Sequence, residues 1–156
     1  MKPTMPGLYL LLENTPRVTE TFSECLQAPH VTLAHSPDPG DAALFEDLAK
    51  SVHLHLCPVI TCESATLSKF TNRNGSEVYD VLLGFDERSK KQIKSLRAFL
   101  FTETPPAHWN VRNPHITFSR SWCMRDLEYQ MARGKKLVSG SHEECTFRTS
   151  GVATKL

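Results

Sequence analysis

The chain has 156 residues, of which 18 are basic and 17 acidic, so its formal net charge is only +1. This length fits a single domain, or two small halves that share one core. A nearly neutral chain lacks the general positive field that holds long nucleic acid by neutralising its phosphates. We therefore expect a small or short anionic ligand and no duplex nucleic acid.

The cysteines and the first apolar run indicate the compartment. The five cysteines are odd in number and form no CxxC pair, which argues against a disulfide framework or a zinc ribbon. Unpaired thiols favour a reducing interior. The apolar run Leu8–Leu12 is too short for a signal-peptide core or a membrane span. These features predict a soluble, cytoplasmic protein with no membrane partner.

The first third of the chain predicts strand, helix, strand and helix in that order. Leu8–Leu12 lies between turn-forming residues and indicates a buried strand. Apolar residues at spacings of three and four over Arg17–Gln27 indicate a short amphipathic helix. Pro29–Ser36 alternates like a strand and ends at a cluster of proline and glycine. A helix is expected from Asp41 to Val52, with Asp41 capping its first turn.

The remainder predicts a hairpin followed by helix, strand, helix and strand. The hairpin combines His55–Cys62, extended toward Phe70, with Glu77–Phe85 across an Asn-rich turn that ends in Gly75. The later elements are expected at Asp86–Phe101, Pro114–Ser121, Met124–Arg133 and His142–Thr149. Strands joined by helices or hairpins over this length predict an α+β domain with two lobes.

The most specific feature is an octapeptide that occurs twice. Pro29–Ser36 reads PHVTLAHS and Pro114–Ser121 reads PHITFSRS, so the Pro, His, Thr and final Ser coincide. The other positions are mostly exchanges between residues of similar size. Two histidines in equivalent local settings suggest two equivalent roles.

Each copy places an imidazole beside a hydroxyl. Residues i and i+2 of a strand share a face, so His30 projects with Thr32, and His115 with Thr117. The apolar residues between and after them point into the core and hold each pair rigidly. One histidine can take a proton from a nucleophile while the other gives one to a leaving oxygen, and the threonine hydroxyls can bind non-bridging phosphate oxygens. This chemistry requires no metal and no cofactor.

The two His-x-Thr motifs, 85 residues apart and each within an apolar strand, resemble those of the 2H phosphoesterases. The resemblance covers most of the chain in element order. It implies one domain over residues 1–156, with a pseudo-two-fold bilobal fold in which antiparallel sheets form a central cleft and helices lie outside. It also implies metal-independent cleavage of phosphodiesters that involve a ribose 2′-oxygen or a cyclic phosphate. His30 and His115 would be the acid-base pair and Thr32 and Thr117 the phosphate ligands, with the order of base and acid left open.

The compact, nearly neutral chain is similar to the small viral members of that family. By this analogy we expect a monomer that cleaves a nucleotide second messenger, 2′,3′-cGAMP or a 2′-5′ oligoadenylate, and so counters host innate immunity in the host cytoplasm. Two alternatives stay open. One is a 2′,3′-cyclic phosphodiesterase or RNA-end processing enzyme, and the other is a non-catalytic nucleotide-binding module on the same fold.

Five further residues are candidates for substrate binding. Single-stranded nucleotide sites supply aromatic surfaces for stacking and cations for phosphates. The aromatic candidates are Tyr9, Phe70 and Trp109, and the cationic candidates are Lys69 and Arg120. His35 occupies the position that Arg120 has in the second octapeptide, where a solvated strand end is the default expectation.

A metal-dependent hydrolase is the competing chemical hypothesis. His53, His55 and Cys57 alternate as they would on one face of a strand, and Cys62 follows. Their spacing fits no strong zinc pattern. We expect them to form a partly exposed strand face and no metal site.

Overall fold

The computed structural model describes residues 5–25, 27–72, 74–102 and 105–156. Its strands are β1 (Gly7–Leu12), β2 (His30–His35), β3 (Val59–Thr71), β4 (Glu77–Phe85), β5 (Ile116–Ser121) and β6 (Thr146–Ala153). Its α-helices are α1 (Pro16–Thr21), α2 (Ala42–Lys50), α3 (Glu87–Leu100) and α4 (Met124–Val138). Two 3-10 turns, η1 (Pro39–Asp41) and η2 (Leu54–Leu56), complete the described elements. Within these ranges no helix is both long and apolar enough to cross a membrane.

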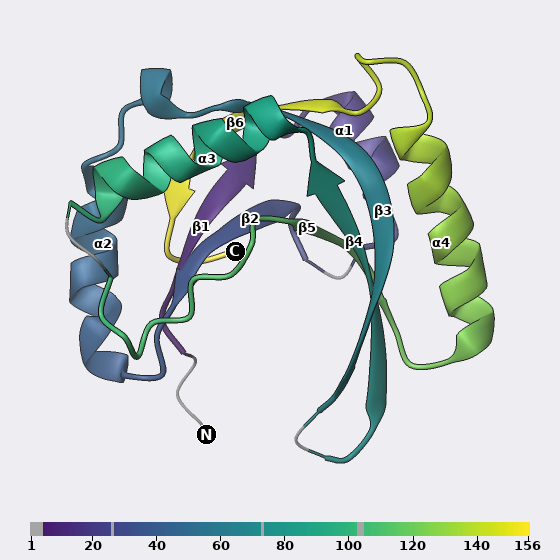
Figure 1. The fold of residues 1–156 in the computed structure, drawn as a ribbon, viewed down its shortest axis with the longest axis horizontal. Helices are drawn as coiled ribbons and strands as arrows, with labels where there is room; N and C mark the ends of the chain where they lie inside the picture. The colour runs from purple at the N-terminus through teal and green to yellow at the C-terminus, as the bar shows by residue number, and fades with distance from the viewer. Residues whose placement is uncertain (1–4, 26, 73, 103–104) are drawn as a thin grey trace.

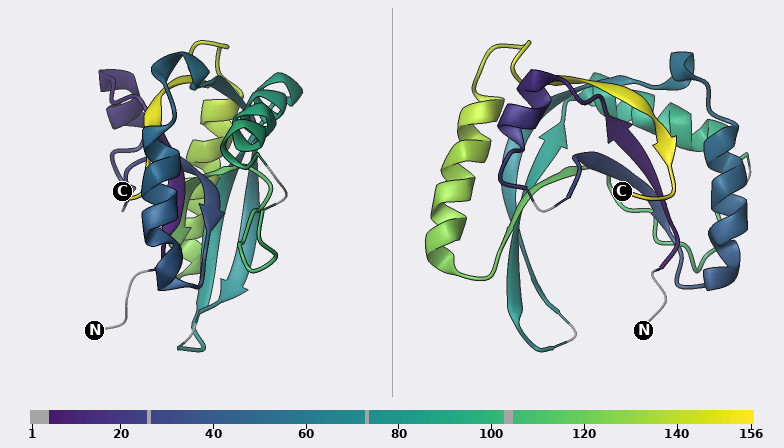
Figure 2. Two further views of the ribbon diagram at one scale, coloured as in Figure 1. Left: turned by 90° about the vertical axis from the view of Figure 1, so that its left-hand side faces the viewer. Right: turned by 180° about the vertical axis from the view of Figure 1, so that it is seen from behind.

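The six strands form a closed ring in the order β1-β2-β5-β4-β3-β6, and every neighbouring pair is antiparallel. The ring consists of two three-stranded halves, β6-β1-β2 and β3-β4-β5. The chain bends these halves into an arch with strands on the inner side and α2, α3 and α4 outside (Figure 1). Figure 2 shows from behind how β6 lies beside β1. The α+β, bilobal fold expected from the sequence is confirmed.

Local sequence signals explain the elements that match their predictions best. Helix α3 starts at Asp86, whose side chain accepts a hydrogen bond from the backbone N–H of Ser89, as an N-cap does. The β3–β4 hairpin turns through Gly75, which has a positive φ of 79° that glycine adopts without steric cost. The Asn72 side chain accepts hydrogen bonds from two backbone N–H groups in the same turn.

Several boundaries differ from the predicted ones, and four of them are instructive. Helix α1 ends at Thr21, and β6 begins only at Thr146. Strand β3 begins at Val59 and not at His55, because residues 54–56 form a 3-10 turn and Pro58 has no N–H for a ladder. Helix α4 continues past Arg133 through Gly134, a residue that usually weakens a helix.

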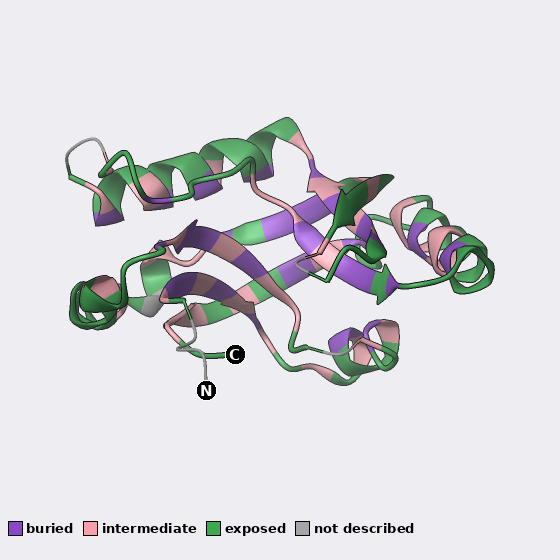
Figure 3. Cartoon of the chain, turned by 90° about the horizontal axis from the view of Figure 1, so that it is seen from below, coloured by how far each residue is buried: buried purple, intermediate pink, exposed green. Residues whose placement is uncertain are grey.

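Gly134 allows α4 to lie close to the strands. A Cβ atom at this position would be 3.1 Å from Val81 Cγ1 and 3.3 Å from Ala65 Cβ. Packing of α4 against the outer faces of β3 and β4 therefore offsets the loss of helix stability that the glycine causes. In Figure 3 the buried residues of α3 lie on the side of that helix that faces the strands, and its exposed residues lie on the other side.

Candidate active site

The two motif strands are direct neighbours in the ring. β2 and β5 pair at Val31 and Ile116, the residues that follow the two motif histidines. Extending this antiparallel register by one residue in each direction places His30 opposite Thr117 and Thr32 opposite His115. The pseudo-two-fold axis thus passes beside the Val31–Ile116 pair. Each histidine is set next to the threonine of the other motif.

Both histidine rings are oriented by the same kind of hydrogen bond. Nδ1 of His30 lies 2.7 Å from the carbonyl oxygen of Ala28, and Nδ1 of His115 lies 3.0 Å from that of Asn113. A carbonyl oxygen can only accept, so each Nδ1 carries the proton and donates it. This fixes the tautomer and directs Nε2 of each ring to act as base when neutral and as acid when protonated.

The electrostatic setting of His30 favours its neutral form. Burial lowers the pKa of His30, the hydrogen bond to Ala28 opposes this shift, and the nearby His115 lowers the pKa further. Because the pKa falls, the ring is neutral at neutral pH and keeps a lone pair on Nε2. These properties suit a general base.

The interaction between the two rings can be measured directly. We expect the His115→Asn substitution to raise the pKa of His30, because it removes a neighbouring positive charge. Titration of the ring Hε1 signal by NMR would report the change, and the wild-type value is expected below 6.5. His142→Asn in an exposed loop is the control and should leave the value unchanged. An unaltered His30 pKa in His115→Asn would show that the rings do not interact.

A β-bulge occurs at the same place in both motif strands. Tyr9 pairs with Thr32 but Leu8 pairs with Ala34, so Leu33 is an extra residue in β2. In the same way β4 pairs with Thr117 and then with Ser119, so Phe118 is extra in β5. Such a bulge shifts the alternation of faces by one residue.

We call the sheet face that carries His30, Thr32, His115 and Thr117 the motif face. The bulges bring one more residue of each octapeptide onto this face. In both strands the two residues at the bulge are buried, Leu33 with Ala34 and Phe118 with Ser119. The residue that follows, His35 or Arg120, therefore turns to the side of the histidine and threonine. The solvated strand end expected for His35 is not what the structure has, because His35 is half-buried.

Tyr9 lies beside the motif histidines, on the neighbouring strand β1. Its ring centroid is 5.2 Å from that of His30 in an edge-to-face arrangement. Its hydroxyl oxygen lies 3.1 Å from Nε2 of His35, with which it shares a hydrogen bond. A side chain at Gly7 would overlap the Tyr9 ring, so the ring can keep this place only beside a glycine. Burial lowers the pKa of His35, as it lowers that of His30.

Arg120 and Phe70 lie together on the inner face of the β3–β4 hairpin. Nε and Nη2 of Arg120 donate to the two carboxylate oxygens of Asp80 at 2.8 and 2.9 Å. The guanidinium carbon lies 5.1 Å from the centroid of the Phe70 ring. Alternation along β3 turns Lys69 to the opposite face, where it forms an ion pair with Glu77 at 3.0 Å. This position argues against the predicted contact between Lys69 and substrate.

Trp109 is a core residue, contrary to its predicted role as a stacking surface. Only 8% of the residue is exposed. Its ring packs edge-to-face between Phe45 and Phe101, at centroid distances of 4.7 and 5.5 Å. Its indole N–H donates to Asp41 Oδ2 at 2.9 Å. The ring leaves no face for a base.

Arg97 of α3 is a positioning residue that the sequence did not reveal. Its Nη2 donates to the carbonyl oxygen of Thr32 at 3.0 Å, and its Nε to that of Leu33 at 3.2 Å. These carbonyls lie where the bulge interrupts the regular ladder of β2. The guanidinium satisfies both and so fixes the backbone that carries Thr32. Nothing in the local pattern of α3 distinguishes Arg97 from its other cations.

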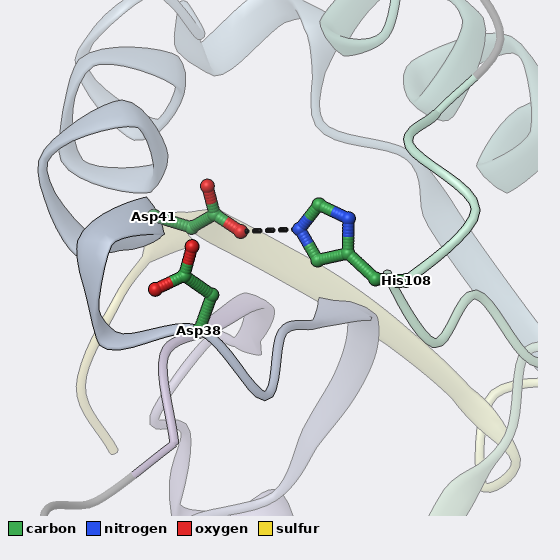
Figure 4. Close-up of side chains that lie close together, drawn as sticks. All are labelled: Asp38, Asp41 and His108. Carbon is green, nitrogen blue, oxygen red and sulfur yellow. Dashed lines mark hydrogen bonds and ion pairs between the residues drawn. The ribbon is translucent and has the colours of Figure 1, made fainter.

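The described residues include one group of ligand-type side chains close enough to hold a metal ion, Asp38, Asp41 and His108 (Figure 4). Asp41 Oδ2 already accepts hydrogen bonds from Ser36 Oγ, His108 Nε2 and Trp109 Nε1 at 2.6 to 2.9 Å. These bonds lower the pKa of Asp41. The carboxylate therefore joins the 108–109 segment to the end of β2, and it makes no side-chain cap for α2, contrary to prediction.

The cysteine and histidine residues considered for zinc are not among the side chains that come close enough together to hold a metal ion in the described part of the chain. The rings of His53 and His55 stack at a centroid distance of 5.7 Å in and before the 3-10 turn. Cys62 is buried on β3, where burial and the neighbouring Cys145 raise its pKa. A raised pKa disfavours the thiolate that a metal requires.

A hollow of about 520 Å³ lies away from the motif face, between α3 and residues 55–59. Its lining includes the apolar residues Leu56, Leu96 and Phe99 and the cations Arg88 and Lys91. No motif residue lines it. Size alone does not define a reaction site, and this hollow lacks the paired proton carriers of the motif face.

The architecture is that of a known fold. Six antiparallel strands in two pseudo-symmetric halves, each contributing one His-x-Thr strand, constitute the 2H phosphoesterase fold. The structure of Usb1 from Kluyveromyces marxianus is similar, with a TM-score of 0.57 and 11% identity over 95% of this chain and 92% of that chain. A second Usb1 structure, with uridine monophosphate, has a TM-score of 0.54 and 11% identity over 97% of this chain and 98% of that chain. No protein-family model matches the sequence, and no curated protein matches it.

Proposed function

We propose that the protein is a metal-independent phosphodiesterase that acts on RNA ends, including ends that carry a 2′,3′-cyclic phosphate. The observation that carries this proposal is the β2–β5 pair, which sets two similarly oriented imidazoles beside two threonines on one face. Such a set provides a base, an acid and hydroxyl donors without any bound ion.

The proton transfers follow from the hydrogen bonds of the site. The nucleophile is either a water molecule or a ribose hydroxyl. Nε2 of neutral His30 takes a proton from it, and its deprotonated oxygen attacks phosphorus. The P–O bond to the leaving oxygen breaks, and that oxygen takes the proton from Nε2 of the His115 imidazolium. Thr32 and Thr117 donate hydrogen bonds to the non-bridging oxygens as charge builds on them. Exchange with solvent then resets both rings.

His30 is assigned as the base because its pKa is lowered by burial and by His115. A base with a lowered pKa is deprotonated at neutral pH and available to the nucleophile. His115 takes the acid role as the partner on the other side of the axis. The NMR titration described above tests this assignment, because a wild-type His30 pKa that is not lowered would remove the reason for naming His30 as the base.

The choice of an RNA end over a cyclic dinucleotide or a 2′-5′ oligoadenylate comes from the comparison with known structures. A protein of the same fold binds uridine monophosphate, a single ribonucleotide. No comparison supports an immune messenger as the substrate. The alternative derived from the sequence, RNA-end processing, is therefore the better supported one.

A panel of five substrates tests the proposal. It comprises uridine 2′,3′-cyclic phosphate, UpU, UpU with a 2′,3′-cyclic phosphate end, 2′,3′-cGAMP and a 2′-5′ adenylate dimer, each incubated with EDTA and analysed by chromatography. We expect product from at least one of the three uridine substrates, at an unchanged rate in EDTA. Product from cGAMP or the 2′-5′ dimer, with none from the three uridine substrates, would favour degradation of a nucleotide messenger as the function. Binding without any product would indicate a non-catalytic module.

A further inference from the structure

Arg120 follows Thr117 along β5, on the same face of the sheet. β4 pairs Leu82 with Thr117 and Asp80 with Arg120, so the two positions are two β4 residues apart on one face. Two residues of a strand span about 7 Å. Arg120 therefore lies beside the position of a neighbouring nucleoside and not at the scissile phosphate.

One N–H edge of the Arg120 guanidinium, formed by Nε and Nη2, is already occupied. Nε and Nη2 donate to the Asp80 carboxylate, whose side chain is only 8% exposed. The carboxylate balances the positive charge and takes up two of the five guanidinium N–H groups, so Arg120 attracts a phosphate less strongly than a free arginine would. This arrangement weakens the case for Arg120 as a phosphate ligand.

The flat face of the guanidinium is a further surface that Asp80 leaves open to a ligand. The guanidinium carbon lies over the Phe70 ring, 5.1 Å from its centroid, while 43% of the Arg120 side chain is exposed. Asp80 fixes the plane and Phe70 supports it from one side, so little conformational freedom is left to lose on binding. Unpaired bases stack on guanidinium planes as they do on aromatic rings.

We propose that the base of a nucleotide flanking the scissile phosphate stacks on the exposed face of Arg120, which Phe70 backs and Asp80 holds. This inference rests on the proposed function and adds a base-binding position to it. The position is not restricted to one base, because every base has a flat face.

The affinity of dinucleotides for a protein variant that cannot cleave them tests the proposal. The parent protein for this experiment carries His30→Ala and His115→Ala, and the ligands are UpU and two counterparts that lack one base or the other. Isothermal titration calorimetry gives each affinity. We expect one abasic ligand to bind about tenfold more weakly than UpU, as the loss of one stacked base predicts.

Three substitutions in that parent locate the effect. Arg120→Lys keeps the charge but removes the plane, and Phe70→Leu removes the backing ring while leaving the Asp80 pair intact. Each should reduce the tenfold difference to about twofold or less. Lys69→Gln, on the opposite face of the same hairpin, should leave it unchanged.

The outcomes separate the inference from the proposed function. Equal affinity for UpU and both abasic ligands, or a full tenfold difference that persists in both Arg120→Lys and Phe70→Leu, would overturn the stacking site. Cleavage of UpU by the protein with intact histidines would leave the proposed function standing in that case. Base-dependent binding without cleavage would support the stacking site and reject the enzyme.

Discussion

Replacing either motif histidine by alanine is expected to reduce the rate of cleavage of the preferred uridine substrate by about 10²- to 10⁴-fold. His30 and His115 are both half-buried on the open face, and the apolar residues beneath them stay in place. The melting temperature should therefore change little. Initial rates with the most active uridine substrate, together with circular dichroism, would measure both effects.

The control and the pH dependence make this prediction specific. His142→Ala, in an exposed loop, should retain the full rate. The basic form of His30 exists above its pKa, and that pKa is lowered, so the rate should persist to a pH below the 6.5 typical of histidine. Full activity in His30→Ala or His115→Ala would exclude the two-histidine mechanism. Loss of activity only together with unfolding would leave the histidines a structural role.

Phe118→Ala is expected to cause the largest loss of stability, about 3–5 kcal/mol. Phe118 is the extra residue of the β5 bulge and is 1% exposed. Its ring packs edge-to-face on Phe22 at 5.5 Å, and the Arg133 guanidinium lies 5.0 Å above it. Truncation leaves a cavity between β5, α1 and α4. A loss of this size is a large part of the 5–15 kcal/mol that holds a typical domain folded.

Denaturation in urea would measure the change, with Phe99→Ala as the matched control. Phe99 is 47% exposed on α3, so its removal should change the free energy of unfolding by less than about 0.5 kcal/mol. If Phe118→Ala cost no more than Phe99→Ala, the bulge would not be anchored by its side chain. The register of β5 would then have to depend on backbone pairing alone.

The sequence predicted what depends on local pattern. Alternation placed His30 with Thr32 and His115 with Thr117 on exposed faces, and it predicted β4 and α3 closely. The pairing of β2 with β5 arises from contacts between residues 85 apart, which no local pattern contains. The similarity of the two octapeptides was the only sequence signal of that symmetry.

The errors in the predicted site have physical causes. The bulges shift the alternation by one residue, and this shift turned His35 inward without any sign in composition. Lys69 and Phe70 are adjacent in β3 and so point to opposite faces, which the predicted strand already implied. Trp109 lies in an irregular segment where periodicity gives no face at all, and only the packing around it showed that it belongs to the core.

Closure of the ring makes the order of synthesis important. β6 is the last strand to emerge during translation, yet it fills the gap between β1, the first strand, and β3. Until it is made, β1 and β3 each present an unpaired edge, which is a template for association between chains. Contacts between the two ends of a chain also slow folding, because a long loop must close first. We expect nascent chains to depend on protection of these edges, and late folding to limit the yield of folded protein.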